Sequence, residues 1–340
     1  MKWERTVTVI GCHVGGEEND VIVGGVLPPP GATMFEKKRY LETHGDELRR
    51  WLLFEPRGKP TLCVNLVTPS TRPDCDVGLI IMESSDYPPM SGSNTICTVT
   101  VLLETGMLPM REPVTSLTLD TPAGPVPVEA TCRDGKVERV TFTNVPCFAV
   151  QLGATVEVEG FGAIQVDVAY GGAFFAIVDA ATLGFTVEPK EARDLVALGN
   201  RVTAAAAQQL SVRHPENPDI ARVTFTEFAM PFAGPGTVSR NAVVVAPGRI
   251  DRSPCGTGTS ARLAVLHARG LLAPGQGFVH ESIIGSRFDA AIARETTVGG
   301  RPAIIPTIAG QAWITGVFQH GLDPSDPFRT GYTLPDLWFA

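Results

Sequence analysis

Residues 253–262 read SPCGTGTSAR, so a single cysteine stands between a proline and a glycine-rich run. This composition is typical of a turn that opens a helix. A helix N-terminus exposes unpaired N–H groups and the positive end of the helix dipole. A cysteine at this position is therefore expected to have a lowered thiol pKa, and the adjacent N–H groups can bind a carboxylate. The segment predicts a reactive Cys255 beside the Cα atom of a bound amino acid.

The same run contains a second pattern, since Gly256, Gly258 and Ala261 fit the G-x-G-x-x-A turn that binds dinucleotides. Such a turn follows its strand directly, whereas residues 247–254 (PGRIDRSP) separate the first glycine from the strand that we expect to end near Ala246. A dehydrogenase, which would bind NAD saturably, is therefore the remote alternative.

A second segment of the chain repeats this one. Residues 91–109 align without a gap with residues 255–273, an offset of 164 that is close to half of the 340-residue chain. Both segments predict a helix of about four turns, closed by glycine at Gly106 and Gly270. In this alignment Ser91 occupies the place of the cysteine.

The elements around the two segments recur in the same order. Each half has a strand, a glycine-containing turn, an amphipathic helix and two further strands before the repeated helix. The expected strands and helices are 6–10, 45–54, 62–67 and 77–82 in the first half, and 164–168, 190–210, 223–228 and 242–246 in the second. This predicts two related domains of the mixed α/β (α+β) class.

Two helix N-termini of this kind can perform cofactor-independent proton transfer at a Cα atom. One group removes the proton, the group facing it returns a proton from the other side, and N–H donors stabilise the charge that spreads into the carboxylate. Asp251, four residues before Cys255, is placed to hold the substrate ammonium. An ordinary cap or turn role is the alternative for this aspartate.

Composition and charge exclude several classes of protein. The formal net charge is −8 and the pI is about 5.3, so a phosphate backbone would be repelled and nucleic acid is not an expected partner. The chain has no run of about 20 apolar residues and no pattern of a signal peptide, so no membrane is expected either. The seven cysteines form no C-x-x-C pair, which argues against structural zinc and for a reduced, cytoplasmic protein.

Five segments resemble the proline racemase family, which includes hydroxyproline 2-epimerases and trans-3-hydroxy-L-proline dehydratases. They are HVGGEEN (13–19), EPRGKP (55–60), MSGSNT (90–95), VDVAYGGAFFAIVDA (166–180) and DRSPCGTGTSA (251–261). The resemblance covers nearly the whole chain and implies the diaminopimelate epimerase-like fold. In that fold two pseudo-symmetric domains each curl a sheet around a central helix, with the active site in the cleft between them. Because the C-terminal segment returns to the first domain in this fold, we expect domains of 1–155 plus about 320–340, and of 156–319.

The resemblance also implies the parts of the site. The N–H groups of Gly92, Ser93, Gly256 and Thr257 would bind the substrate carboxylate, and Asp251 would contact the ring nitrogen. No cofactor and no metal are expected. Hydroxyproline is the expected small-molecule substrate. A homodimer is one possible assembly, and the sequence does not decide the oligomeric state.

The chain departs from the family at its first active-site motif. Racemases and 4-hydroxyproline epimerases carry MCGH, whereas this chain reads MSGS, so that Ser91 replaces a thiol and Ser93 a histidine. Because a hydroxyl is a much weaker base than a thiolate, efficient two-thiol racemisation is not expected. A single thiol can still support elimination from trans-3-hydroxy-L-proline, whose hydroxyl shares a ring face with the Cα proton.

We therefore predict a bifunctional enzyme that dehydrates trans-3-hydroxy-L-proline to Δ1-pyrroline-2-carboxylate and epimerises it at C2 to cis-3-hydroxy-D-proline. The alternatives are a 4-hydroxyproline 2-epimerase or proline racemase, and, from another class, a non-catalytic imino-acid binding protein. The catalytic residues are predicted to be Ser91 and Cys255, and which of them is the base for the L-substrate is left open.

Overall fold

The computed structural model describes residues 3–338, and its internal contacts divide the chain into two compact units. Unit 1 runs up to Phe142 and resumes at Gly310, and unit 2 comprises Thr143–Ala309. Both boundaries lie roughly ten residues before the positions expected from the sequence. The boundary expected at residues 155–156 falls instead within a hairpin, in which residues 148–158 pair with residues 162–170 inside unit 2.

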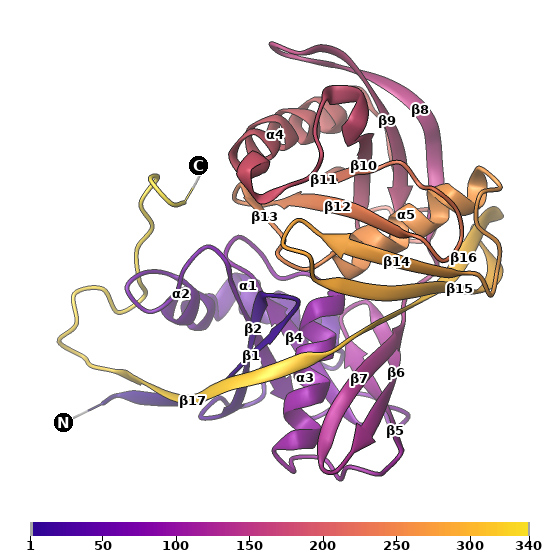
Figure 1. Cartoon of the computed structure of the whole chain (residues 1–340). Coiled ribbons are helices and arrows are strands. Elements are labelled where there is room, and N and C mark those ends of the chain that lie inside the picture. Colours follow the sequence, from indigo (N-terminus) through magenta and orange to yellow (C-terminus); the bar gives the residue numbers. More distant parts are fainter. Residues whose placement is uncertain (1–2, 339–340) are drawn as a thin grey trace. The chain divides into compact units, whose positions relative to one another are not determined.

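Within residues 3–338, unit 1 contains a curled sheet and three helices (Figure 1). The hydrogen-bonded strand order is β17–β1–β2–β3–β4–β5–β6–β7. The elements are β1 (Arg5–Val14), β2 (Glu17–Gly24), α1 (Met34–His44), α2 (Glu47–Leu53), β3 (Leu62–Thr68), β4 (Val77–Met82), α3 (Gly92–Glu104), β5 (Val114–Thr121), β6 (Gly124–Arg133), β7 (Lys136–Thr143) and β17 (Ala312–Leu322).

Helix α3 is the central element of unit 1. It contacts β1, β2, β3 and β17, and every residue from Gly92 to Leu103 is buried. A helix that is buried on all sides lies in a core rather than on a surface. The opposite face of the sheet is covered by α1 and α2, whose Met34, Leu41 and Trp51 pack in one cluster with side chains of the strands.

Unit 2 has the same construction. Its strand order is β8–β9–β10–β11–β12–β14–β15–β16, with the short β13 also paired to β12. The elements are β8 (Phe148–Val158), β9 (Gly162–Tyr170), β10 (Phe174–Asp179), η1 (Ala180–Leu183), η2 (Pro189–Glu191), α4 (Ala192–Gln209), β11 (Val223–Ala229), β12 (Val238–Val245), β13 (Arg249–Ile250), α5 (Gly256–Ala268), β14 (Gly277–Ser282), β15 (Arg287–Val298) and β16 (Arg301–Gly310).

Two neighbouring residues of β10 show how this sheet is covered on both faces. Phe174 packs in the cluster that contains Leu195, Leu198 and other residues of α4, whereas Phe175 packs with Val265 and its neighbours on α5. Successive side chains of a strand point to opposite faces, so α4 and α5 lie on opposite sides of the sheet. The succession of antiparallel and parallel pairings is the same in both units, which confirms the duplication and the predicted fold class.

The two central helices end alike. The backbone N–H groups of Thr105 and Arg269 bond to the carbonyls of Val101 and Val265, and a glycine with positive φ follows each helix. These glycines are Gly106 at +73° and Gly270 at +70°, as the repeated sequence predicted.

Helix α1 is an element that the sequence reasoning missed. Thr33 caps it, since its Oγ1 accepts a hydrogen bond from the Glu36 N–H at 3.1 Å, and Glu36 Oε2 accepts one from Ala32 N–H at 2.7 Å. Thr-x-x-Glu is a capping-box pattern that the sequence displays. In residues 3–338 we find no helix with both the length and the apolar character needed to cross a membrane.

Candidate functional site

Cys255 lies directly before α5, at the N-cap position. Its Sγ accepts a hydrogen bond from the Gly258 N–H at 3.3 Å and lies 3.5 Å from Thr257 Oγ1. Its backbone has φ +63°, a conformation that costs a non-glycine residue about 1–3 kcal/mol. Strain of this kind persists only where neighbouring groups hold the residue, and it marks Cys255 as a candidate functional position.

The loop before α5 holds the cysteine through a short chain of hydrogen bonds. Asp251 Oδ1 accepts hydrogen bonds from both the backbone N–H and the Oγ of Ser253, each at 2.8 Å. Ser253 Oγ in turn accepts the Cys255 N–H at 3.1 Å. The Asp251 carboxylate thus has two roles, since it accepts the hydrogen bonds that shape this turn and also places a negative charge close to the thiol. The residue is only 9% exposed, so water screens this charge little.

The electrostatic environment corrects one prediction. A helix start was expected to lower the thiol pKa, but burial, followed by the charge of Asp251, raises the pKa of Cys255 well above its usual range. The Thr257 hydroxyl and the Gly258 N–H lower the pKa, but by less than burial raises it. In the absence of a ligand the thiol is therefore protonated at neutral pH.

Replacing Asp251 by asparagine separates its two roles. Asparagine keeps the Oδ1 acceptor for Ser253 and removes the charge, so we expect the pKa of the Cys255 thiol to fall, which pH-dependent alkylation of Cys255 would measure. If Asp251 contacts the ring nitrogen, as the family resemblance implies, the KM for an imino acid should also rise at least about tenfold. The matched control is Asp323→Asn, because Asp323 Oδ1 accepts the same pair of bonds from Ser325, at 2.9 and 2.7 Å, on the surface. An unchanged thiol titration in Asp251→Asn would contradict this assignment.

Ser91 occupies the equivalent N-cap position of α3 but differs in conformation. Its φ is −149°, and its side chain does not cap the helix. Instead, Ser91 Oγ accepts a hydrogen bond from Asn94 Nδ2 at 2.9 Å and lies 3.3 Å from Ser93 Oγ. Ser93 Oγ donates in turn to Asn19 Oδ1 at 3.4 Å. These neighbours are uncharged and include no base that would take the Ser91 proton, so a hydroxyl here is better suited to donating a proton than to removing one.

The four residues predicted to bind the substrate carboxylate lie at the N-termini of the two central helices. Gly92 and Ser93 are the first two residues of α3, and Gly256 and Thr257 are the first two of α5. The first N–H groups of a helix have no carbonyl partner within it. Within each unit the structure therefore brings the predicted residues together at one helix start. Their role toward a ligand stays a prediction.

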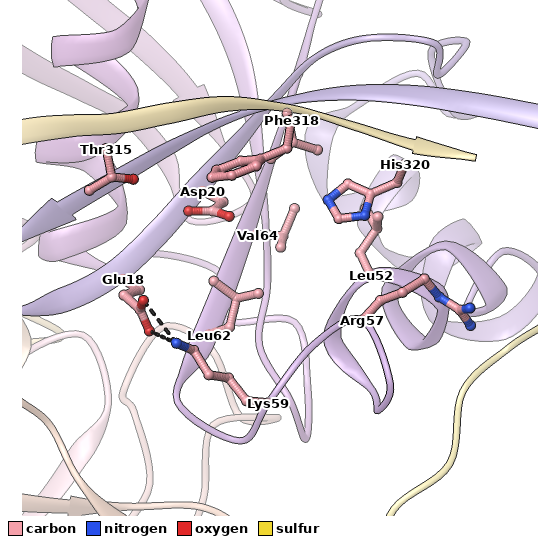
Figure 2. A pocket seen from close by; sticks show the side chains of 11 residues that line it. Glu18, Asp20, Leu52, Arg57, Lys59, Leu62, Val64, Thr315, Phe318 and His320 are labelled. Atoms are coloured by element: carbon pink, nitrogen blue, oxygen red, sulfur yellow. Dashed lines mark hydrogen bonds and ion pairs between the residues drawn. The ribbon is translucent and has the colours of Figure 1, made fainter. Parts of the chain in front are cut away.

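Unit 1 also contains a cavity of about 260 Å³ that the sequence reasoning missed (Figure 2). Asp20 and Phe318 line it, and burial raises the pKa of Asp20 to about 6. At its rim Glu18 forms an ion pair with Lys59 at 2.7 Å. Asp20 is on the face of β2 opposite to Asn19, which contacts Ser93, because strand side chains alternate. The cavity is therefore not part of the Ser91 site.

A second feature without a sequence signal lies beneath Cys255. Glu227, Asn241 and His280 are at most 1% exposed and come from three strands, β11, β12 and β14. Nothing in their local sequence points to a shared position, because only the sheet register brings them together. The described residues provide no cluster of His, Cys, Asp and Glu side chains arranged to hold a metal ion.

Comparison with known proteins gives the same fold and a family. Residues 9–333 match the proline racemase family. A hydroxyproline epimerase from Agrobacterium vitis, solved with bound trans-4-hydroxy-L-proline, is 43% identical, with a TM-score of 0.93 over 100% of this chain and 99% of that one. A probable proline racemase from Agrobacterium radiobacter K84, solved with bound carbonate, is also 43% identical, with a TM-score of 0.92 over 98% of each chain.

A more distant structure shares the fold alone. The Bacillus anthracis phenazine biosynthesis protein of the PhzF family is 13% identical, with a TM-score of 0.58 over 94% of this chain and 99% of that one. At this identity the likeness carries no information on chemistry.

Proposed function

Because the chain belongs to the proline racemase family, which implies isomerase activity, we propose that it acts on hydroxyproline by cofactor-independent proton transfer at Cα. The proposed activities are dehydration of trans-3-hydroxy-L-proline to Δ1-pyrroline-2-carboxylate and epimerisation of the same substrate at C2. The proposal rests on the difference between the two helix N-termini. The Cys255 thiol caps α5, whereas the residue at the equivalent position of α3 is Ser91, which has a hydroxyl.

Substrate binding would favour the thiolate. The charge of Asp251 helps to raise the pKa of the Cys255 thiol. A cationic ring nitrogen beside Asp251 would offset that charge, so the thiol pKa falls when the substrate binds. The N–H groups at the helix starts would bind the carboxylate and stabilise the charge that develops there.

Dehydration needs one proton-exchanging group. The Cys255 thiolate takes the Cα proton, and the electron pair of the broken C–H bond forms the C2=C3 double bond as the C3–O bond breaks. The hydroxyl leaves on the same ring face, so the thiol just formed can protonate it to water. The enamine then tautomerises to Δ1-pyrroline-2-carboxylate. No other residue has to remove a proton.

Epimerisation needs a second group, because a new proton must reach the other face of Cα. Ser91 is the proposed donor, since its Oγ accepts from Asn94 and its proton, which faces only the Ser93 hydroxyl, is held by no base. Ser91→Ala is therefore expected to lose epimerisation at least about tenfold while dehydration changes less than about threefold. Ser91→Cys should raise epimerisation relative to dehydration. Product ratios measured by NMR test both variants, and equal losses of the two activities in Ser91→Ala would contradict the division of roles.

A second candidate is a 4-hydroxyproline 2-epimerase, which is favoured by the bound trans-4-hydroxy-L-proline in the Agrobacterium vitis relative. The decisive experiment incubates the protein in D2O with trans-3- and trans-4-hydroxy-L-proline separately and follows both by NMR. Loss of the 3-hydroxy substrate to a ketimine trapped by o-aminobenzaldehyde supports dehydration. Deuterium at C2 of the 4-hydroxy substrate alone supports the second candidate, and no change in either would leave an imino-acid binding protein.

A further inference from the structure

The buried groups beneath Cys255 form one connected network. Glu227 Oε1 lies 3.7 Å from His280 Nε2, and His280 Nδ1 is hydrogen-bonded to Thr259 Oγ1 at 2.9 Å. Thr259 Oγ1 also reaches the Pro254 carbonyl at 3.3 Å. Glu227, Thr259 and His280 are all 0% exposed, so these interactions operate without competition from water.

The network ends at the peptide unit that precedes the cysteine. The Pro254 carbonyl accepts hydrogen bonds from Thr259 Oγ1 and from Asn241 Nδ2, the latter at 2.8 Å. This peptide carries the N–H of Cys255, whose φ of +63° needs external support. Thr259 and Asn241 therefore hold the cysteine in its strained conformation.

Glu227 also lies close to the thiol through space. A methyl group placed on Gly258 would be 3.1 Å from Glu227 Oε2 and 3.3 Å from the Cβ of Cys255, so both residues adjoin the same glycine. Neither Glu227 Oε2 nor His280 Nε2 has a hydrogen-bond partner among the described residues, 3–338. A carboxyl group buried in this way for structure alone would be costly.

We propose that Glu227 is a positioning residue whose protonation state, passed through His280 and Thr259, controls the placement and the reactivity of the Cys255 thiol. When Glu227 is protonated, a small rotation of its carboxyl group lets it donate to His280 Nε2. His280 then carries its proton on Nδ1 and donates to Thr259, whose single hydroxyl proton goes to the Pro254 carbonyl. Each donor in this chain has one acceptor.

Ionisation of Glu227 reverses the chain. The carboxylate draws the His280 proton to Nε2, so Nδ1 becomes an acceptor and takes the Thr259 hydroxyl proton away from Pro254. The peptide before Cys255 loses one of its two donors, and a negative charge appears beside the thiol, where it opposes thiolate formation. Burial raises the pKa of Glu227 to about 8, so the change falls at mildly alkaline pH.

The other ionisable groups near Glu227 do not account for a change at this pH. Burial keeps the pKa of His280 well below its usual range, so its imidazole is neutral throughout. Arg262 of α5 remains cationic and favours the Glu227 carboxylate, although burial lowers its own pKa. The pKa of Cys255 is raised by burial and by Asp251, so its own ionisation increases reactivity as the pH rises.

The inference rests on the proposed function only for its effect on turnover, so the primary test needs no substrate. Alkylation of Cys255 by iodoacetamide, resolved by peptide mass spectrometry, is measured from pH 6 to 10 in the wild type and in Glu227→Gln. Glutamine retains a donor and cannot ionise. The two proteins should react alike below about pH 7, and Glu227→Gln should react about five to ten times faster above about pH 9. Superimposable profiles would overturn the proposal.

Thr259→Val tests the relay itself. It removes the hydroxyl without changing the shape of the side chain, so alkylation should slow about tenfold below about pH 7, where Thr259 donates to Pro254, and should change little above about pH 9, where Thr259 donates to His280. The fold should be unchanged by circular dichroism. The matched control is Thr95→Val at the aligned position of α3, a residue that is also 0% exposed and should leave Cys255 unaffected. Unchanged alkylation in Thr259→Val would exclude the relay. If alkylation follows these expectations and no hydroxyproline is turned over, the proposed function fails and the relay stands.

Discussion

Cys255→Ser is expected to lower kcat/KM for both proposed reactions by about 10²–10⁴-fold, the usual contribution of a positioned proton-transfer group. A serine hydroxyl remains protonated at any pH compatible with the fold, even when a substrate ammonium offsets the charge of Asp251. The serine oxygen can still accept the Gly258 N–H, so the cap of α5 is retained. The expected loss is therefore chemical rather than structural.

The measurement is deuterium incorporation at C2 together with ketimine formation in D2O, followed by NMR on both proteins. Thermal unfolding of the variant should match that of the wild type within a few degrees, which serves as the folding control. Cys147→Ser is the matched control variant, since Cys147 is a fully buried thiol of the same unit whose Sγ donates to the Val145 carbonyl at 3.0 Å. Wild-type exchange in Cys255→Ser would remove the thiol from the mechanism.

The fold was largely predictable because the chain repeats its elements in order. The alignment of residues 91–109 with 255–273 located both central helices, and their closing glycines adopt positive φ as expected. The boundaries between the units were less accurate. Only pairing shows that β8 belongs with β9 and that β17 belongs with β1, and strand pairing is a long-range property.

The candidate site was predictable only to the extent that it is local in sequence. Ser91, Cys255 and the glycines beside them follow from two short motifs and from the chemistry of helix starts. The direction of the Cys255 pKa does not, because burial and the charge of Asp251 are properties of the folded unit. Glu227, Asn241 and His280 were missed for the same reason, since the register of three strands places them under α5.

Gly171→Ala is expected to have the second large effect, because the turn between β9 and β10 packs directly against the first turn of α5. A Cβ atom at Gly171 would lie 2.1 Å from the Thr257 carbonyl oxygen and 2.6 Å from the Ala261 nitrogen, both of them backbone atoms. The backbone must move, and such overpacking costs about 1–3 kcal/mol of folding free energy. Asn144 ties the two segments together, with its Nδ2 donating to the Gly171 carbonyl at 2.9 Å and to Ser260 Oγ at 2.8 Å.

The shift in Gly171→Ala would displace the start of α5 and therefore the thiol. Misplacement of a reacting group by about 1 Å can cost about 10²-fold in rate, so kcat should fall by a similar factor. Gly277→Ala is the matched control, because no atom lies within 4 Å of a Cβ added there and its φ is not in the left-handed region. Urea unfolding and proton exchange in D2O measure the two effects on the same samples. If Gly171→Ala retained wild-type stability and exchange while Gly277→Ala did the same, the contact between the turn and α5 would not determine where Cys255 lies.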